Sequence, residues 1–115
     1  MRKKIFISTL ALNNFKLDKI IKIIKKNKVD GIDLAPLTIF KSWNNFENNL
    51  NKFKTKLEYN NIKINALQGI FFKKNINLFY SSKKKIANIT KHLNKIIKIT
   101  KFLGAKKIII GSSYF

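Results

Sequence analysis

Several short apolar runs of this sequence end in polar or glycine residues that could take part in binding or catalysis. They are Ser8, Asp33, Gln68, Gly111 and Ser112. A carboxylate accepts hydrogen bonds, whereas a serine hydroxyl and a glutamine amide both donate and accept them, so the set suits a ligand rich in hydroxyl groups. These residues can act together only if parallel strands bring the ends of the runs to one edge, as at the carboxyl ends of barrel strands.

The elements that would position these residues follow from an apolar pattern that alternates between short runs and helical spacing. Strands are predicted at residues 4–10, 62–67 and 108–110, and residues 29–36 are predicted to be a tight turn that leads into a short strand ended by Pro36. Helices are predicted from an N-cap at Asn13 or Asn14 to about Asn27, from about Asn44 to Asn60, and from a cap at Ser81 or Ser82 to Gly104. The order β-α-β-α-β-α-β predicts an α/β fold in which right-handed crossovers place parallel strands side by side.

Each predicted helix has one apolar face. The first carries Leu17, Ile20, Ile21 and Ile24, the second Phe46, Leu50, Phe53 and Leu57, and the third Ile86, Ile89, Leu93, Ile96, Ile97 and Leu103. No linker or low-complexity segment divides the 115 residues. Residues 1–115 are therefore predicted to be a single unit of four strands and three helices, which is the length of one ordinary domain.

The chain carries a formal net charge of +20, from 25 basic and 5 acidic residues. Such a charge ordinarily favours nucleic acid or an anionic surface as a partner. Here the basic residues are lysines except for Arg2, and they accompany many asparagines and isoleucines, whose codons are rich in A and T. A mutational bias of the genome predicts the same composition. The absence of an arginine cluster also argues against a nucleic-acid site, because arginine is the preferred residue for bidentate contacts.

Cysteine is absent, which excludes disulfides, thiolate metal ligands and a cysteine nucleophile. Residues 1–12 resemble a signal peptide only faintly, and Ser8 and Thr9 favour a first strand instead. No run approaches the roughly 18 apolar residues needed to span a bilayer. A cytoplasmic protein with no membrane partner is the expectation.

Three segments, taken in order, resemble the xylose isomerase-like (β/α)8 TIM barrel superfamily, which includes sugar phosphate isomerases and epimerases. Residues 29–36, VDGIDLAP, resemble its second strand, and residues 66–72, ALQGIFF, resemble the end of its third. His92 and Leu93, followed by LGAKKIIIGS at residues 103–112, resemble the third helix and the start of the fourth strand. These segments are spread over residues 29–112, which is most of the chain, so the resemblance implies the N-terminal half of such a barrel.

The resemblance implies that a complete barrel binds a sugar or sugar phosphate and holds a divalent metal through carboxylates and histidine, mostly on the later strands. No residue of this chain is assigned to a metal, because those ligands fall beyond the fourth strand. The chain is expected not to be catalytically competent alone. It could be a gene fragment, a truncated product or half of a homodimer that pairs open sheet edges. The alternatives are a remnant without activity and a basic nucleic-acid-binding module related to apurinic endonucleases.

Asp33, Gln68, Gly69 and Ser112 are the residues predicted to bind substrate. Asp33 occupies a position where the resembling proteins usually have a glutamate that faces the pocket, although it could instead cap its own loop through backbone amides. Gln68 could bind a polyol, with Gly69 letting the backbone approach it, or it could be a turn residue that satisfies its own loop. No catalytic residue is assigned.

His92 is the only histidine, so a role as general base or metal ligand would fall to it. Its place in the middle of the third predicted helix favours a structural or solvent-facing role, far from the strand ends. Trp43 is predicted to pack or to anchor a loop. The aromatic residues after the third strand are predicted to anchor their loop rather than to stack on a sugar; they are Phe71, Phe72, Phe79 and Tyr80.

Overall fold

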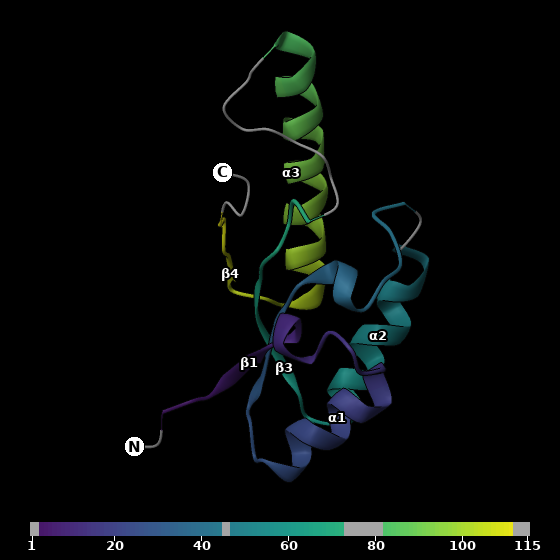
Figure 1. Ribbon diagram of the computed structural model, residues 1–115, viewed down its shortest axis with the longest axis vertical. Coiled ribbons are helices and arrows are strands. Elements are labelled where there is room, and N and C mark those ends of the chain that lie inside the picture. Colours follow the sequence, from purple (N-terminus) through teal and green to yellow (C-terminus); the bar gives the residue numbers. More distant parts are fainter. Residues whose placement is uncertain (1–2, 45–46, 73–81, 112–115) are drawn as a thin grey trace.

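Four short strands alternate with three helices in the computed structural model, which describes residues 3–44, 47–72 and 82–111 (Figure 1). The strands are β1 (Phe6–Ser8), β2 (Gly31–Leu34), β3 (Lys63–Leu67) and β4 (Lys107–Ile108). The helices are α1 (Leu17–Lys26), α2 (Glu47–Tyr59) and α3 (Lys83–Leu103). Two 3₁₀ turns, η1 (Thr9–Leu12) and η2 (Pro36–Thr38), follow β1 and β2. The predicted order of strands and helices is confirmed.

The strands form one parallel sheet in the order β1-β2-β3-β4. Phe6 pairs with Gly31 between β1 and β2, and Leu67 pairs with Ile108 between β3 and β4. Each strand therefore lies beside its predecessor, as expected when a helix returns the chain to the starting end of the sheet. The prediction of an α/β fold with parallel strands is confirmed, and β1 and β4 are the edge strands.

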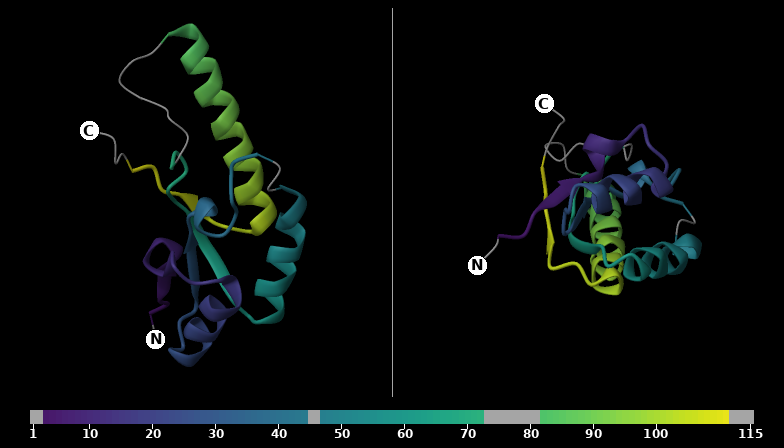
Figure 2. Two further views of the ribbon diagram at one scale, coloured as in Figure 1. Left: turned by 45° about the vertical axis from the view of Figure 1, so that its right-hand side comes forward. Right: turned by 90° about the horizontal axis from the view of Figure 1, so that it is seen from below.

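The three helices lie on one side of the sheet, and the core lies between the two layers (Figure 2). Ile32 and Leu34 of β2 and Ile64 of β3 are buried against the helices. As predicted for α1 and α2, the buried helical residues are Ile20, Ile21 and Ile24 of α1 and Leu50, Phe53 and Leu57 of α2. Phe46, which was assigned to the same face of the second helix, lies outside the described residues.

The buried face of α3 differs from the predicted one. Ile86 and Ile97 are exposed by 52% and 42%, although the helical spacing assigned both to the apolar face. Ile96 and Leu103 are buried as predicted, and His92, Ile99 and Thr100 are buried in addition. The first turns of α3 extend past the end of the sheet, where no strand lies beneath them (Figure 1). Apolar periodicity therefore overestimates the buried length of this helix.

Three element boundaries also differ from the prediction. The first strand ends at Ser8, because Thr9 turns the chain into η1, and α1 begins after Lys16 without a side-chain cap rather than at Asn13 or Asn14. The last strand is Lys107–Ile108 rather than residues 108–110. Ile110 is 61% exposed, so the apolar run continues beyond the part of the sheet that covers it.

The predicted caps of α3 are confirmed. Ser82 precedes the helix, and its Oγ accepts a hydrogen bond from the backbone N–H of Lys85 at 3.2 Å. Gly104 follows the helix with a φ of 73°, the left-handed conformation that glycine adopts without a Cβ penalty. Asn27 likewise ends α1, as predicted. Local sequence signals therefore set these helix ends.

Exposed lysines are spread over the surfaces of all three helices. α1 carries Lys19, Lys22, Lys25 and Lys26, α2 carries Lys52 and Lys56, and α3 carries Lys83, Lys84, Lys85, Lys91, Lys98 and Lys101. This even spread is what a genome-wide composition bias predicts for the helical surface. Among the described residues, no helix combines the length and the apolar character that crossing a bilayer requires.

Candidate functional site

Four polar side chains from three neighbouring strands meet at the carboxyl ends of the sheet; we name Ser8, Asp33, Asn65 and Gln68 the rim cluster. Ser8 pairs with Asp33 in the register of β1 and β2. The Asn65 side-chain amide donates a 2.9 Å hydrogen bond to Asp33 Oδ1. The Gln68 side-chain amide reaches across the end of β2 and donates to Ser8 Oγ. All four residues are partly buried, so ligand atoms can still approach them.

A bulge in the sheet explains why Asn65 belongs to this cluster. Ile32 pairs with Ile64, but the next residue of β2, Asp33, pairs with Ala66. Asn65 is therefore the extra residue of β3, and a bulge of this kind re-aims the side chain that it leaves without a cross-strand partner. Its amide contacts the Asp33 carboxylate as a result. The sequence analysis did not identify Asn65. The one signal that could have pointed to it is a polar residue within an apolar run.

Gln68 and Gly69 lie directly after β3 and continue its contact with β2. The backbone N–H of Gln68 donates to the carbonyl of Leu34 at 2.8 Å. Gly69 has a φ of 59°, and a Cβ on it would lie 3.3 Å from the Cβ of Ala35. Glycine is therefore favoured here by conformation and by the close approach of the chain that follows β2.

The structure brings Asp33, Gln68 and Gly69 to the same end of the sheet, whereas Ser112 lies outside the described residues. The hydrogen bond of Asp33 goes to a side chain of β3 rather than to the backbone of its own loop. That of Gln68 goes to a side chain of β1 rather than to its own turn. The first contact joins the neighbouring strands β2 and β3, and the second reaches from the end of β3 across β2 to β1. The residues therefore lie where a shared ligand would contact them together.

Buried Thr9 and partly buried Thr38 form a hydrogen-bonded pair next to the rim cluster. Thr9 is fully buried, and its Oγ1 accepts a 2.9 Å hydrogen bond from the backbone N–H of Ala35. Thr38 Oγ1 lies 2.7 Å from Thr9 Oγ1 and donates to the carbonyl of Ala35 at 2.6 Å. These bonds connect the segments that follow β1 and β2, so they hold Ser8 and Asp33 in register. The prediction did not identify this pair.

His92 anchors the segment after β3 to α3. It is only 3% exposed, and its Nε2 lies 2.5 Å from the carbonyl oxygen of Ile70. Its ring packs edge-on against Trp43 with centroids 4.7 Å apart, and the Phe71 ring lies 5.7 Å away. The predicted structural role of His92 and the anchoring roles of Trp43 and Phe71 agree with these contacts.

Of the two roles predicted for His92, the structural one holds, because the residue is buried. It was also expected to lie far from the strand ends, yet it contacts Ile70, which follows the end of β3. Phe79 and Tyr80 lie outside the described residues. Phe72 contributes through its backbone, since its carbonyl accepts a 2.6 Å hydrogen bond from the Trp43 indole.

An ion pair extends this anchor to the start of α2. Lys95 Nζ lies 2.9 Å from Glu47 Oε1 and 2.5 Å from the carbonyl oxygen of Trp43. Partial burial raises the pKa of Glu47, but the hydrogen bond from Lys95, a backbone N–H and the Lys95 charge outweigh it. The net pKa lies below the ordinary value of 4.5. The pair is half exposed, so it adds less than about 1 kcal/mol to stability.

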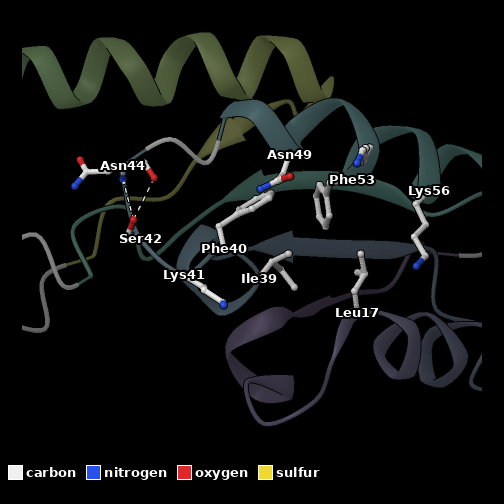
Figure 3. Close-up of a pocket in the computed structure, with 10 residues that line it drawn as sticks. Leu17, Ile39, Phe40, Lys41, Ser42, Asn44, Asn49, Phe53 and Lys56 are labelled. Carbon is white, nitrogen blue, oxygen red and sulfur yellow. Dashed lines mark hydrogen bonds between the residues drawn. The ribbon is translucent and has the colours of Figure 1, made fainter.

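A separate surface pocket lies between the start of α1 and the first half of α2 (Figure 3). Its apolar floor contains Ile39, Phe40 and Phe53, and Asn49 and Lys41 border it. Ser42 accepts a hydrogen bond from the backbone N–H of Asn44 and donates one to its carbonyl, which shapes the loop at one end of the pocket. No member of the rim cluster lines this pocket.

The rim cluster does not by itself supply the ligands of a divalent metal. Magnesium and calcium take six or more oxygen ligands, usually including more than one carboxylate. Asp33 is the only carboxylate of the cluster, and within the described ranges no three His, Cys, Asp or Glu residues gather as a metal site would require. The arrangement can bind hydroxyl groups, because a carboxylate has about four lone-pair positions and Asn65 uses one of them.

No protein family, curated protein or solved structure matches this chain. The fold and the rim cluster define an α/β protein with a parallel sheet. A carboxylate, two amides and a hydroxyl stand at the carboxyl ends of its first three strands.

Proposed function

We propose that this chain contributes the first four βα units of a (β/α)8 barrel that binds a sugar or sugar phosphate at the rim cluster. The observation that carries the proposal is the sheet order β1-β2-β3-β4, in which each parallel strand lies beside its predecessor and the helices lie on one side. A barrel adds its strands in this way, whereas doubly wound sheets reverse direction from a central strand and carry helices on both faces.

The chemistry of the rim cluster supports a polyol ligand. Asp33 can accept hydrogen bonds from sugar hydroxyls, and the Gln68 amide can both donate and accept. Gly69, in its left-handed conformation, lets the chain after β3 pack close to Ala35, which keeps Gln68 beside the rim. The described residues could bind hydroxyl groups in this way without a metal. We propose that a complete barrel would also hold a divalent metal.

Replacing Asp33 with asparagine should weaken sugar binding about tenfold, because a charged acceptor becomes a neutral amide. The wild-type chain is titrated with xylose, ribose 5-phosphate and glucose 6-phosphate while amide and side-chain NMR signals are followed. We expect at least one of these compounds to shift the signals of Asn65 and Gln68.

The matched control is Asp18→Asn, which makes the same chemical change on the exposed surface of α1. Sugar affinity should be unchanged in this variant. If none of the compounds shifts the rim signals, or if both variants bind equally weakly, the rim cluster is not a sugar site.

We further propose that a second copy of the chain can supply the other four units. Both edge strands offer unpaired backbone groups, and Ile110, beyond β4, is 61% exposed. Light scattering after gel filtration should give a mass of about twice 13.4 kDa. Ile110→Lys should shift the protein toward the monomer, because the pairing edge would then carry a charge.

The control for this prediction is Ile86→Lys on the projecting end of α3, where an isoleucine is similarly exposed at 52%. It should leave the dimer intact. A wild-type chain that stays monomeric over the whole concentration range tested contradicts the proposed pairing of copies.

A further inference from the structure

Three lysines gather at the amino-terminal ends of the strands, opposite the rim cluster; we name Lys4, Lys63 and Lys106 the lysine triad. Lys63 begins β3, Lys4 precedes β1, and Lys106 precedes β4. β3 separates Lys63 from Gln68 by five residues, which is about 16 Å at 3.3 Å per residue. A ligand at the triad therefore occupies a different place from a sugar at the rim.

The backbone of the sheet brings the triad together. Asp30 receives a 2.7 Å hydrogen bond from the Ile5 N–H on its carboxylate and donates its own N–H to the Ile5 carbonyl at 2.8 Å. The carbonyl of Asp30 accepts from the N–H of Lys63 at 3.2 Å, and the N–H of Lys106 donates to the Asn65 carbonyl at 3.0 Å. Lys63 and Lys106 therefore bond through their own backbone N–H groups to the neighbouring segment of the sheet. Lys4 directly precedes Ile5, which bonds to Asp30.

The missing side chain of Gly31 contributes to this convergence. Gly31 lies between β1 and the start of β3, and a Cβ on it would contact the carbonyl group of Lys63. β2 and β3 can therefore approach closely at this point, because Gly31 has no side chain. Lys4 and Lys63 line the same pocket.

A pocket of about 420 Å³ contains all three lysines, and its apolar wall includes Phe6, Leu57 and Leu103. This volume falls within the range of small-ligand sites. Lys54 and Glu58 also border the pocket, but they pair with each other at 3.8 Å, and Lys54 lies over the Phe102 ring. Within the described residues, no ion pair joins a triad lysine to a carboxylate.

The electrostatics of the triad favour an anion. The pKa of Lys63 is lowered because Lys4 lies within hydrogen-bonding reach and carries a like charge, and Lys106 adds to the effect; the carboxylate of Asp30 acts in the opposite direction. The net effect is a lowered pKa, so the repulsion between these like charges exceeds the opposing effect of Asp30. A multiply charged anion between them would replace that repulsion with attraction, and lysine is a common ligand of phosphate groups.

We propose that the lysine triad binds the phosphate or pyrophosphate group of a small molecule. The site is compact and contains no arginine, so it suits a point of high negative charge rather than the extended backbone of a nucleic acid. It is distinct from the proposed sugar site, because Ser8, Asp33 and Gln68 do not line the triad pocket, whereas Asn65 borders both.

The test measures binding of inorganic pyrophosphate to the full chain at low salt by calorimetry. The double variant Lys63→Gln with Lys106→Gln should weaken binding about tenfold or more, since each lysine supplies a charge-assisted contact. The control is Lys26→Gln with Lys84→Gln, which removes the same charge from exposed positions on α1 and α3. This control should bind pyrophosphate as the wild type does.

Two results would overturn the proposal. One is that pyrophosphate does not bind to the wild-type chain. The same holds if it binds equally weakly to both double variants, because the overall positive charge would then account for binding. The other is that a single-stranded oligonucleotide loses affinity in the triad variant whereas pyrophosphate does not. Asp33→Asn should leave pyrophosphate binding unchanged, so failure of the sugar site and failure of the triad are told apart.

Discussion

Replacing Gly31 with alanine is expected to lower the free energy of unfolding by about 3 kcal/mol, the cost of severe overpacking next to a backbone that cannot move freely. A Cβ at this position would lie 2.7 Å from the carbonyl carbon of Lys63 and closer still to its oxygen. That carbonyl belongs to β3, the neighbour of β2 in the sheet. Relief of the clash would require the two central strands to separate.

Urea denaturation followed by circular dichroism measures this effect. The matched control is Gly111→Ala, because a Cβ at Gly111 would meet no atom within 4 Å. The control should change the unfolding free energy by less than about 0.5 kcal/mol, as substitutions away from packed features usually do. Equal stability of the two variants would contradict the close approach of β2 and β3 at this point.

Replacing His92 with leucine is expected to cost about 2 kcal/mol, mainly because a buried carbonyl loses its hydrogen-bond partner. The carbonyl belongs to Ile70, which is only 2% exposed. The edge-on contact with Trp43 would be lost as well. Since Ile70 follows Gln68 and Gly69, loosening this anchor should also broaden the NMR signals of the rim.

Lys91→Leu is the control for this variant, because Lys91 is the exposed neighbour of His92 on α3. It should leave both the unfolding free energy and the indole N–H signal of Trp43 close to their wild-type values. A His92→Leu variant that is as stable as the wild type but no longer binds sugar would contradict the anchoring role. His92 would then be a residue that contacts the ligand.

The strands and helices could be predicted from local pattern, and the parallel topology followed from their order. Apolar spacing correctly identified the inner face of α1, and Gly104 marked the end of α3. The boundaries near Thr9 could not be predicted, because that residue turns away from the strand to bond to Ala35, which is distant in sequence. The exposure of Ile86 depends on where the sheet ends beneath α3, which periodicity does not report.

The candidate site was only partly predictable. Asp33 and Gln68 were found because they lie near the carboxyl ends of predicted strands, which parallel pairing brings to one edge, and because of the resemblance at these positions. Asn65 joined them only through a bulge, and a bulge depends on the pairing of two strands rather than on either strand alone. The lysine triad escaped prediction because three lysines among so many carry no local signal.

By itself, the sequence determined the α/β class, the order of the elements and the parallel direction of the strands, because these depend on periodicity and on crossover length. The tertiary structure alone decided that His92 bonds to the chain after β3 and that Lys4, Lys63 and Lys106 share one pocket. The physical reason is that contacts between segments distant in sequence depend on strand register and on close backbone approach. Neither can be deduced from the periodicity of apolar residues.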